Sequence, residues 1–290
     1  MPIPFVTIGV IAWSVFVCLA INGTKNMSDA NAMRLGIYSL DQIYDGRWWA
    51  LITSAFVHVQ ILHIYFNMYW LWKLGPILER EMGVLGFLGF ILLTAFVSSG
   101  WDMVTGTSGI GFSGVGFAMV GFGWLAREKL PELKPYFTDD TVKWFAGWGV
   151  ICIFLSYFKI LNVGNMAHAM GAVAGGLIAL AFVQKKWIAR VCLVAVTALA
   201  IVPVYWTPWG SQWNFHRGIM AHKQKNYDGA IRYYRRSAEL NPGELGAWIN
   251  IAMIEGYRGH TAEYKDALDH VKMISPEEAK SLISDYGDGK

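Results

Sequence analysis

A serine between glycines is the first feature of this sequence that could carry out covalent chemistry. Ser113 lies in Gly111-Phe112-Ser113-Gly114, where a glycine-rich loop is followed by an apolar stretch typical of a helix. A serine at a helix entrance can cap the first backbone N–H groups. It can also be a nucleophile beside N–H groups that stabilise an oxyanion. These four residues fit both roles, so the rest of the chain must decide between them.

Two other apolar segments carry polar side chains that could complete a hydrolytic site. His168 could take the hydroxyl proton of Ser113 and return it to a leaving amine, as the general base of a dyad. His63 and Asn67 are four residues apart, so they share one helix face and could donate hydrogen bonds to an oxyanion. Each of these residues could instead form an interhelical hydrogen bond without any catalytic role.

The composition places these residues in a membrane protein. Hydrophobic residues make up 54% of the 290-residue chain and charged residues 16%, whereas soluble domains average ~25% charged residues. Fourteen Trp and thirteen Tyr fit interfacial anchors. The net charge of +3 indicates no partner by itself, and no nucleic-acid partner is expected. The three cysteines lie far apart in apolar runs, which predicts small buried residues without a disulfide framework: Cys18, Cys152 and Cys192.

Seven apolar stretches are close to the ~20 residues that a helix needs to cross a bilayer. They predict spans at residues 4–21, 58–78, 84–101, 109–126, 144–161, 164–183 and 187–206. The aromatic stretch 48–52 is too short to span and predicts an interfacial helix or a membrane-dipping loop. The expected fold class is all-α, a polytopic membrane helix bundle over residues 1–206 with a soluble helical domain at 207–290.

Basic residues in the predicted loops set the expected orientation. One side of the membrane would carry nine Lys and Arg: Lys73, Arg80, Arg127, Lys129, Lys134, Lys143, Lys185, Lys186 and Arg190. The other side would carry four: Lys25, Arg34, Arg47 and Lys159. The positive-inside rule makes the richer side cytoplasmic. We therefore expect a cytoplasmic N-terminus and, after seven spans, an extracytoplasmic C-terminal domain.

This topology gives the polar residues a shared depth, because spans two, four and six would all enter from the outer side. The residues within two to three helical turns of that surface would be Ser113, His63, Asn67 and His168. A metal ion held by the histidines, with His58, is the weaker alternative, since Asp102 is the one carboxylate near this depth. We expect Asp102 to face water at the end of its span, so a dyad is predicted rather than a Ser-His-Asp triad.

Small residues indicate that the fourth and sixth spans pack together. His168, Gly171 and Gly175 are spaced so that they lie on one helix face, and faces of small residues let helices approach closely. Packing this face against the fourth span would bring His168 to Ser113. Glycine-rich faces also occur where helices merely pack, so this pattern alone does not assign chemistry.

The C-terminal segment reads as a pair of helical repeats. Residues 207–290 hold 11 of the 24 Lys and Arg and 11 of the 21 Asp and Glu, which indicates a soluble domain. Gly218, Tyr234 and Pro242 fit the small-and-aromatic spacing of a tetratricopeptide repeat, and Pro276 follows Pro242 by one 34-residue period. We expect about two repeats with a closing helix, which would bind a protein partner; a generic helical tail is the alternative.

Three motifs on alternate predicted spans resemble the rhomboid family of intramembrane serine proteases. They are His63-Ile-Tyr-Phe-Asn67, Gly111-Phe112-Ser113-Gly114 and Ala167-His168-Ala-Met-Gly171, and the resemblance covers about residues 45–183. It implies a six-span core with a water-filled cavity open to the outside. The added seventh span and outer repeat domain resemble those of a subset of bacterial rhomboids.

The resemblance also implies roles for individual residues. Ser113 would be the nucleophile and His168 the base, while His63, Asn67 and the Ser113 N–H would form the oxyanion hole. His58 and Asn165 match positions that support this region. Gly111 and Gly114 would give clearance to substrate and neighbouring helices. Phe117 stands where the family commonly has Tyr, so its ring can stack under the histidine without a hydrogen bond.

The sequence therefore predicts a serine endopeptidase in a bacterial inner membrane, without a metal or organic cofactor. The family resemblance supplies its substrates, which would be transmembrane segments of membrane proteins in the lipid bilayer, cleaved near the outer leaflet. One alternative is a catalytically inactive rhomboid-like protein that binds membrane clients; the intact Ser113 and His168 argue against it. A channel or transporter is weaker, because the spans lack the charged residues that such pathways use.

Overall fold

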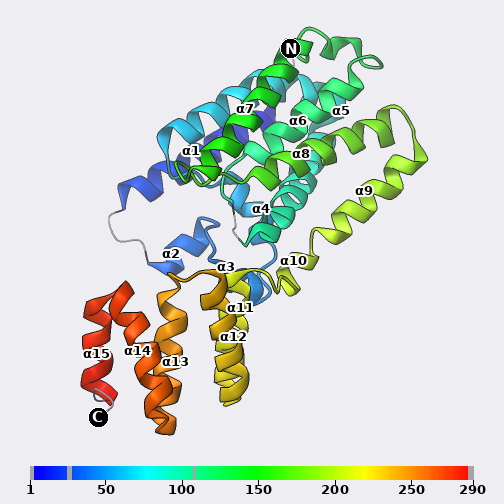
Figure 1. Ribbon diagram of the computed structural model, residues 1–290. Helices are drawn as coiled ribbons and strands as arrows, with labels where there is room; N and C mark the ends of the chain where they lie inside the picture. Colours follow the sequence, from blue (N-terminus) through cyan, green and yellow to red (C-terminus); the bar gives the residue numbers. More distant parts are fainter. Residues whose placement is uncertain (1–2, 25–27, 107–108, 287–290) are drawn as a thin grey trace. The chain divides into compact units, whose positions relative to one another are not determined.

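Helices form all the regular structure in residues 3–24, 28–106 and 109–286, which are the residues that the computed structural model describes, and no strand occurs in them (Figure 1). The prediction of an all-α bundle is confirmed. Two residues of the loop expected before Ser113, 107 and 108, lie outside the described ranges. The chain divides into two units, Met1–Tyr205 and Trp206–Lys290.

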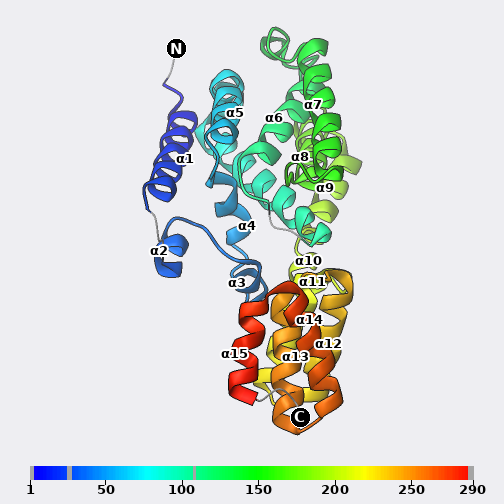
Figure 2. The same ribbon diagram turned by 60° about the vertical axis from the view of Figure 1, so that its left-hand side comes forward.

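A buried carboxylate joins the first two long helices of unit 1. α1 (Phe5–Gly23) packs beside α5 (Ile61–Asp102), as Figure 2 shows. Glu79 of α5 accepts hydrogen bonds from the N–H groups of Val6 and Thr7, both at 2.9 Å, and from the Thr7 hydroxyl at 2.8 Å. These bonds satisfy N–H groups in the first turn of α1 that have no intrahelical partner, so Glu79 fixes the start of α1 against α5.

Short helices connect α1 to α5. They are α2 (Asp29–Arg34), α3 (Leu40–Tyr44), α4 (Ala50–Thr53) and η1 (Ser54–Phe56). α4 contains residues 50–52 of the aromatic stretch 48–52, which was predicted to form an interfacial helix or a membrane-dipping loop. The backbone carbonyl of Ser54 accepts the N–H of Gly111 at 2.9 Å. η1 therefore supports the loop that leads to Ser113.

α5 contains two of the predicted spans. Gly83 breaks its helical geometry with φ 73° and ψ 165°, and a positive φ of this kind favours glycine because it lacks a Cβ. The break falls between residues 78 and 84, where the sequence separates the second and third predicted spans. His58, which was expected to open the second span, lies three residues before the first residue of α5.

The second half of unit 1 is built on α6 (Ser113–Ala126) and α8 (Asn165–Ile178), which lie side by side (Figure 2). η2 (Met103–Thr105) precedes α6, and η3 (Pro131–Leu133) follows it. η4 (Ala179–Val183) continues α8, and α9 (Trp187–Leu199) and α10 (Val202–Tyr205) complete the unit.

α7 (Asp139–Tyr157) begins five residues before the predicted span at 144. The Thr138 side chain accepts the N–H of Thr141 and so caps the helix. Arg127 donates hydrogen bonds to the Phe137 carbonyl at 2.7 Å and to Asp139 at 2.6 Å. The Arg127 guanidinium holds the pKa of the exposed Asp139 carboxyl below its usual range. These contacts start α7 earlier than its apolar residues alone indicate.

Within the described ranges, four helices are long and apolar enough to cross a membrane: Phe5–Gly23, Ile61–Thr105, Asn165–Val183 and Trp187–Tyr205. The Ile61–Thr105 segment has 45 residues and contains the break at Gly83. α6 is a shorter apolar helix. The count of seven spans stays a prediction.

The expected burial of all three cysteines is wrong for one of them. Cys18 and Cys152 are buried, whereas Cys192 is exposed on α9. The buried face of α9 carries Ala189 and Leu193. Cys192 lies outside that face. The sequence does not indicate which face is buried, because the apolar run around Cys192 contains no polar residues that would mark the exposed side.

Unit 2 consists of five helices packed in sequence order. They are α11 (Ser211–Lys223), α12 (Tyr227–Leu240), α13 (Leu245–Arg258), α14 (Thr261–Ile274) and α15 (Pro276–Tyr286). Tyr234 is fully buried, and a Cβ at Gly218 would lie 2.5 Å from its ring. Two helix pairs and a last helix are the arrangement that the predicted repeats require, while their assignment as tetratricopeptide repeats stays a prediction.

Candidate active site

Ser113 and His168 lie within hydrogen-bond distance of each other. Ser113 is the first residue of α6 and His168 is in the first turn of α8. The distance from His168 Nε2 to Ser113 Oγ is 2.8 Å, and His168 is 6% exposed. A neutral imidazole whose Nε2 accepts the hydroxyl proton must carry its own proton on Nδ1. Among the described residues, Nδ1 has no hydrogen-bond partner.

Backbone contact between α6 and α8 sets this distance. A Cβ at Gly171 would collide with the carbonyl oxygen of Gly114, and one at Gly175 would collide with that of Ala118. A Cβ at Gly121 would likewise collide with the carbonyl oxygen of Ala172. The predicted close approach of the two small-residue faces is thus confirmed, and glycine is required on both helices.

The ring of Phe117 covers one face of the His168 imidazole. The two rings are stacked with their centroids 4.4 Å apart and their planes 16° from parallel. Phe117 is one helical turn after Ser113, so the same helix places the hydroxyl at one nitrogen and the ring against the imidazole face. Such a stack limits the orientations that the imidazole can adopt.

His58 connects the loop before Ser113 to α5. Its Nε2 accepts the N–H of Phe112 at 3.2 Å and is 3.0 Å from Nδ2 of Asn67. Since Nε2 accepts from a backbone N–H, the proton of this imidazole resides on Nδ1. The Asn67 amide therefore presents an N–H to His58, which fixes the orientation of the amide beside Ser113.

His63 lies against the loop that leads to Ser113. Gly111 has φ 110°, and a Cβ there would be 2.7 Å from Nε2 of His63. Only a glycine allows both this backbone conformation and this approach of the imidazole. The rings of His58 and His63 are in edge contact with centroids 5.0 Å apart. His63, Asn67 and the N-terminus of α6 thus lie in one region.

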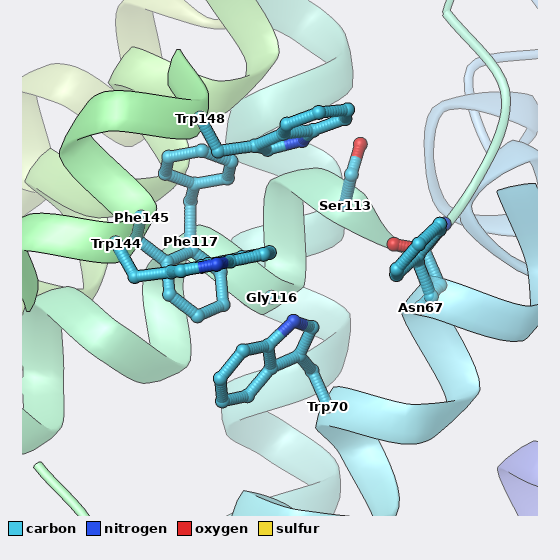
Figure 3. A pocket seen from close by; sticks show the side chains of 9 residues that line it. Asn67, Trp70, Ser113, Gly116, Phe117, Trp144, Phe145 and Trp148 are labelled. Carbon is cyan, nitrogen blue, oxygen red and sulfur yellow. The ribbon is translucent and has the colours of Figure 1, made fainter. Parts of the chain in front are cut away.

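A cavity of about 50 Å³ opens beside Ser113 (Figure 3). Asn67 and Trp70 of α5 line one wall, and Trp144, Phe145 and Trp148 of α7 line the wall opposite. A second, mostly apolar cavity of about 300 Å³ is lined by residues of α6, α7 and α8, among them His168. Ser113 thus lines one cavity and His168 the other, and Phe117 and Phe145 line both.

Two residues of the predicted site have other contacts. Asn165 donates from Nδ2 to the Ser156 hydroxyl at 2.8 Å, which connects α8 to α7. A Cβ at Gly114 would lie 2.5 Å from the Ser98 hydroxyl, so Gly114 gives clearance to α5 as well as to α8. The described residues contain no group of three or more side chains suited to hold a metal ion.

The expectation that Asp102 faces water is wrong. Asp102 is 1% exposed, and its carboxylate accepts the N–H of Gly109 at 3.0 Å and that of Ala167 at 3.2 Å. The sequence does contain one signal for this role, because Gly164 stands where α8 would otherwise carry a capping side chain. The missing cap points to Asp102 only when the end of α5 is known to lie beside α8.

Comparison with known proteins places this geometry in context. Residues 45–185 match the Rhomboid domain family. Proteins named rhomboid protease GlpG from Yersinia pseudotuberculosis and Yersinia pestis are 33% identical over 135 residues, which are 45% of this chain and 47% of each relative. The protein of that name from Photorhabdus laumondii is 33% identical over 134 residues, 46% of either chain. The match thus spans about half the length of these relatives.

The matched segment contains Ser113, His168 and the residues around them, together with two of the four long apolar helices of the described chain, Ile61–Thr105 and Asn165–Val183. These helices are those of a multi-pass integral membrane protein. The comparisons support the rhomboid family for residues 45–185 of this chain.

Proposed function

We propose that the chain is an intramembrane serine endopeptidase that uses Ser113 and His168 as a catalytic dyad. The observation that carries the proposal is the 2.8 Å distance between Ser113 Oγ and His168 Nε2 at the edge of a cavity, within a bundle of membrane-type helices. The similarity of residues 45–185 to proteins named rhomboid proteases supports the same assignment.

In the proposed reaction, Ser113 Oγ attacks the scissile carbonyl carbon while His168 Nε2 takes the hydroxyl proton. The resulting tetrahedral intermediate breaks its C–N bond, and His168 returns the proton to the departing amine. Water then attacks the acyl-serine, with His168 again accepting and returning one proton. Each half-reaction regenerates the neutral imidazole.

Three donors are available for the oxyanion of this intermediate. The Ser113 N–H belongs to the first turn of α6, where N–H groups lack intrahelical acceptors. Asn67 holds one N–H toward His58 and keeps a second. His63 lies beside the same loop at Gly111. Loss of one such donor typically costs ~10²–10³-fold in turnover.

The substrates would be transmembrane segments of other membrane proteins, cleaved near the outer leaflet. A cavity of about 50 Å³ holds a few water molecules, so an extended peptide requires the wall formed by α7 to move. The buried residues of α7 are Phe145 and Cys152, whereas Trp144 is 45% and Trp148 37% exposed. This loosely held helix is therefore the wall that would yield.

The arrangement in the cell is part of the same proposal. The chain would cross a bacterial inner membrane seven times, with the N-terminus in the cytoplasm and unit 2 outside. Unit 2 would bind a protein through its helical repeats. A reporter that is active only outside the cytoplasm, fused after Lys290, should be active. A silent reporter would contradict the seven-span topology.

The catalytic proposal is tested with purified protein in lipid vesicles that contain a model single-span substrate. Wild type should cleave the substrate and react covalently with a fluorophosphonate at Ser113, whereas Ser113→Ala and His168→Ala should do neither above background. Equal cleavage by all three proteins, or none by any, would refute the protease assignment. Substrate capture without cleavage by wild type would instead support the inactive client-binding alternative.

A further inference from the structure

The carboxylate of Asp102 connects the two segments that carry Ser113 and His168. It lies at the last residue of α5, buried between the loop before α6 and the first turn of α8. One oxygen, Oδ2, accepts the N–H of Gly109 at 3.0 Å. The other, Oδ1, accepts the N–H of Ala167 at 3.2 Å. Ala167 directly precedes His168, and Gly109 is four residues before Ser113.

Asp102 supplies α8 with the cap that its own sequence omits. Gly164 occupies the N-cap position, and as a glycine it has no side chain that could accept an N–H of the first turn. Ala167 is the third residue of α8, and its N–H is the group that an N-cap Ser or Asp would normally accept. Because Asp102 reaches this N–H from another helix, the cap also fixes where α8 begins relative to α5.

The backbone around the Asp102 carboxylate leaves it little room to move. A Cβ at Gly109 would lie 2.7 Å from Asp102 Oδ2, and one at Gly164 would lie 3.1 Å from it. A Cβ at Gly109 would also be 3.9 Å from the Cα of Gly164. The two glycine backbones thus enclose the carboxylate and nearly meet across it, which makes Asp102 the joint between the serine loop and the histidine helix.

We propose that Asp102 is a positioning residue that sets the spacing between Ser113 and His168 through these two backbone bonds. The inference rests on the proposed function. Asp102 touches neither reacting atom. Its effect is on the relative position of the Gly109–Ser113 loop and the start of α8, and a displacement of about 1 Å at a dyad can cost ~100-fold in rate.

Asp102→Asn is the sharpest perturbation, because it keeps the shape of the side chain. An amide offers one oxygen and turns an NH₂ group toward the second N–H, so one of the two bonds is replaced by a contact between donors. We expect the rate of Ser113 acylation by a fluorophosphonate, and kcat for the single-span substrate, to fall by about tenfold or more. KM should stay unchanged, because the cavity walls on α5 and α7 are not altered.

Glu79→Gln is the matched control. Glu79 is also a buried carboxylate that accepts two backbone N–H groups, but it fixes α1 to α5 away from the dyad. Gly164→Ala is the second variant, because its methyl group would press on the Asp102 carboxylate and leave the carboxylate itself in place. Thermal unfolding identifies a temperature at which every protein compared is folded, and the rates are measured there.

Loss of rate in Asp102→Asn and Gly164→Ala, with Glu79→Gln near the wild-type rate, supports the inference. Should Asp102→Asn not fold, Gly164→Ala alone decides by the same criterion. A change smaller than about threefold, an equal loss in Glu79→Gln, or a rise in KM with kcat unchanged would overturn it. Wild type that does not react at Ser113 would instead overturn the proposed function, and this inference with it.

Discussion

The contact between α6 and α8 makes Gly171→Ala the most informative substitution in this protein. Gly171 is three residues after His168, on the same helix face, and a Cβ there would meet the carbonyl oxygen of Gly114, the residue after Ser113. The added methyl group has no space, because it would collide with a backbone atom rather than with a flexible side chain. The helices must move apart at the level of the dyad.

The magnitude follows from this geometry. Overpacking of a closely packed contact costs ~1–3 kcal/mol, against ~1 kcal/mol gained when alanine replaces glycine within a helix. The net loss of stability is therefore small, about 0–2 kcal/mol. Separation of the helices by about 1 Å would stretch the 2.8 Å hydrogen bond beyond the usual range and lower kcat by ~100-fold.

The assay compares kcat and Ser113 acylation with thermal unfolding in the same detergent. Gly89→Ala serves as the matched control, because a Cβ at Gly89 on α5 meets no described atom within 4 Å. It should retain the wild-type rate. Gly171→Ala should lose most of its rate while its unfolding temperature changes little.

A Gly171→Ala protein that keeps kcat within about twofold of wild type would refute this reasoning, since a 1 Å displacement should cost far more. So would a loss of rate that follows a large loss of stability. In either case the spacing of Ser113 and His168 would not depend on the backbone contact between the two helices.

Three further changes test other parts of the structure. Phe117→Leu removes the ring stacked on His168 and should lower kcat by up to about tenfold, whereas an unchanged kcat would mean that the stack does not orient the base. Trp148→Ala opens the α7 wall of the cavity and should raise the cleavage rate of the membrane substrate, with slower cleavage contradicting the proposed wall movement. Burial raises the pKa of Tyr234 to about 12 from a usual value of 10, so the unfolded state ionises first and unit 2 loses stability between pH 10 and pH 12. In unfolding curves of the full chain, Tyr234→Phe should lose less stability between pH 10 and pH 12 than wild type. The same loss of stability in both proteins would refute this prediction.

The sequence predicted the central pair of helices well, because glycine spacing and helix packing have a direct physical link. His168, Gly171 and Gly175 share a face, and a face without Cβ atoms allows backbone contact. In the structure that contact is made with Gly114 and Ala118. The proximity of Ser113 and His168 follows from the same rule, since each lies at the first turn of its helix.

Contacts across the chain were harder to predict. Asp102 was expected in water because it ends an apolar stretch, yet it is buried by the loop and by α8. The early start of α7 depends on Thr138 and Arg127, whose partners lie in a connecting segment without periodicity. Cys192 is exposed because α9 packs against the rest of unit 1 through another face. A continuous run of apolar residues does not show which face of its helix will be buried.

The glycine joint between α6 and α8 has a consequence for how the site tolerates thermal motion. Side-chain rotamers change on the picosecond-to-nanosecond timescale, whereas packed helix backbones shift far more slowly. Ser113 and His168 are spaced by backbone contact, while the opposite side of the cavity is formed by the rings of α7. Movement that admits a substrate can thus be confined to the aromatic wall, so the nucleophile and its base need not be realigned each time a peptide enters or leaves.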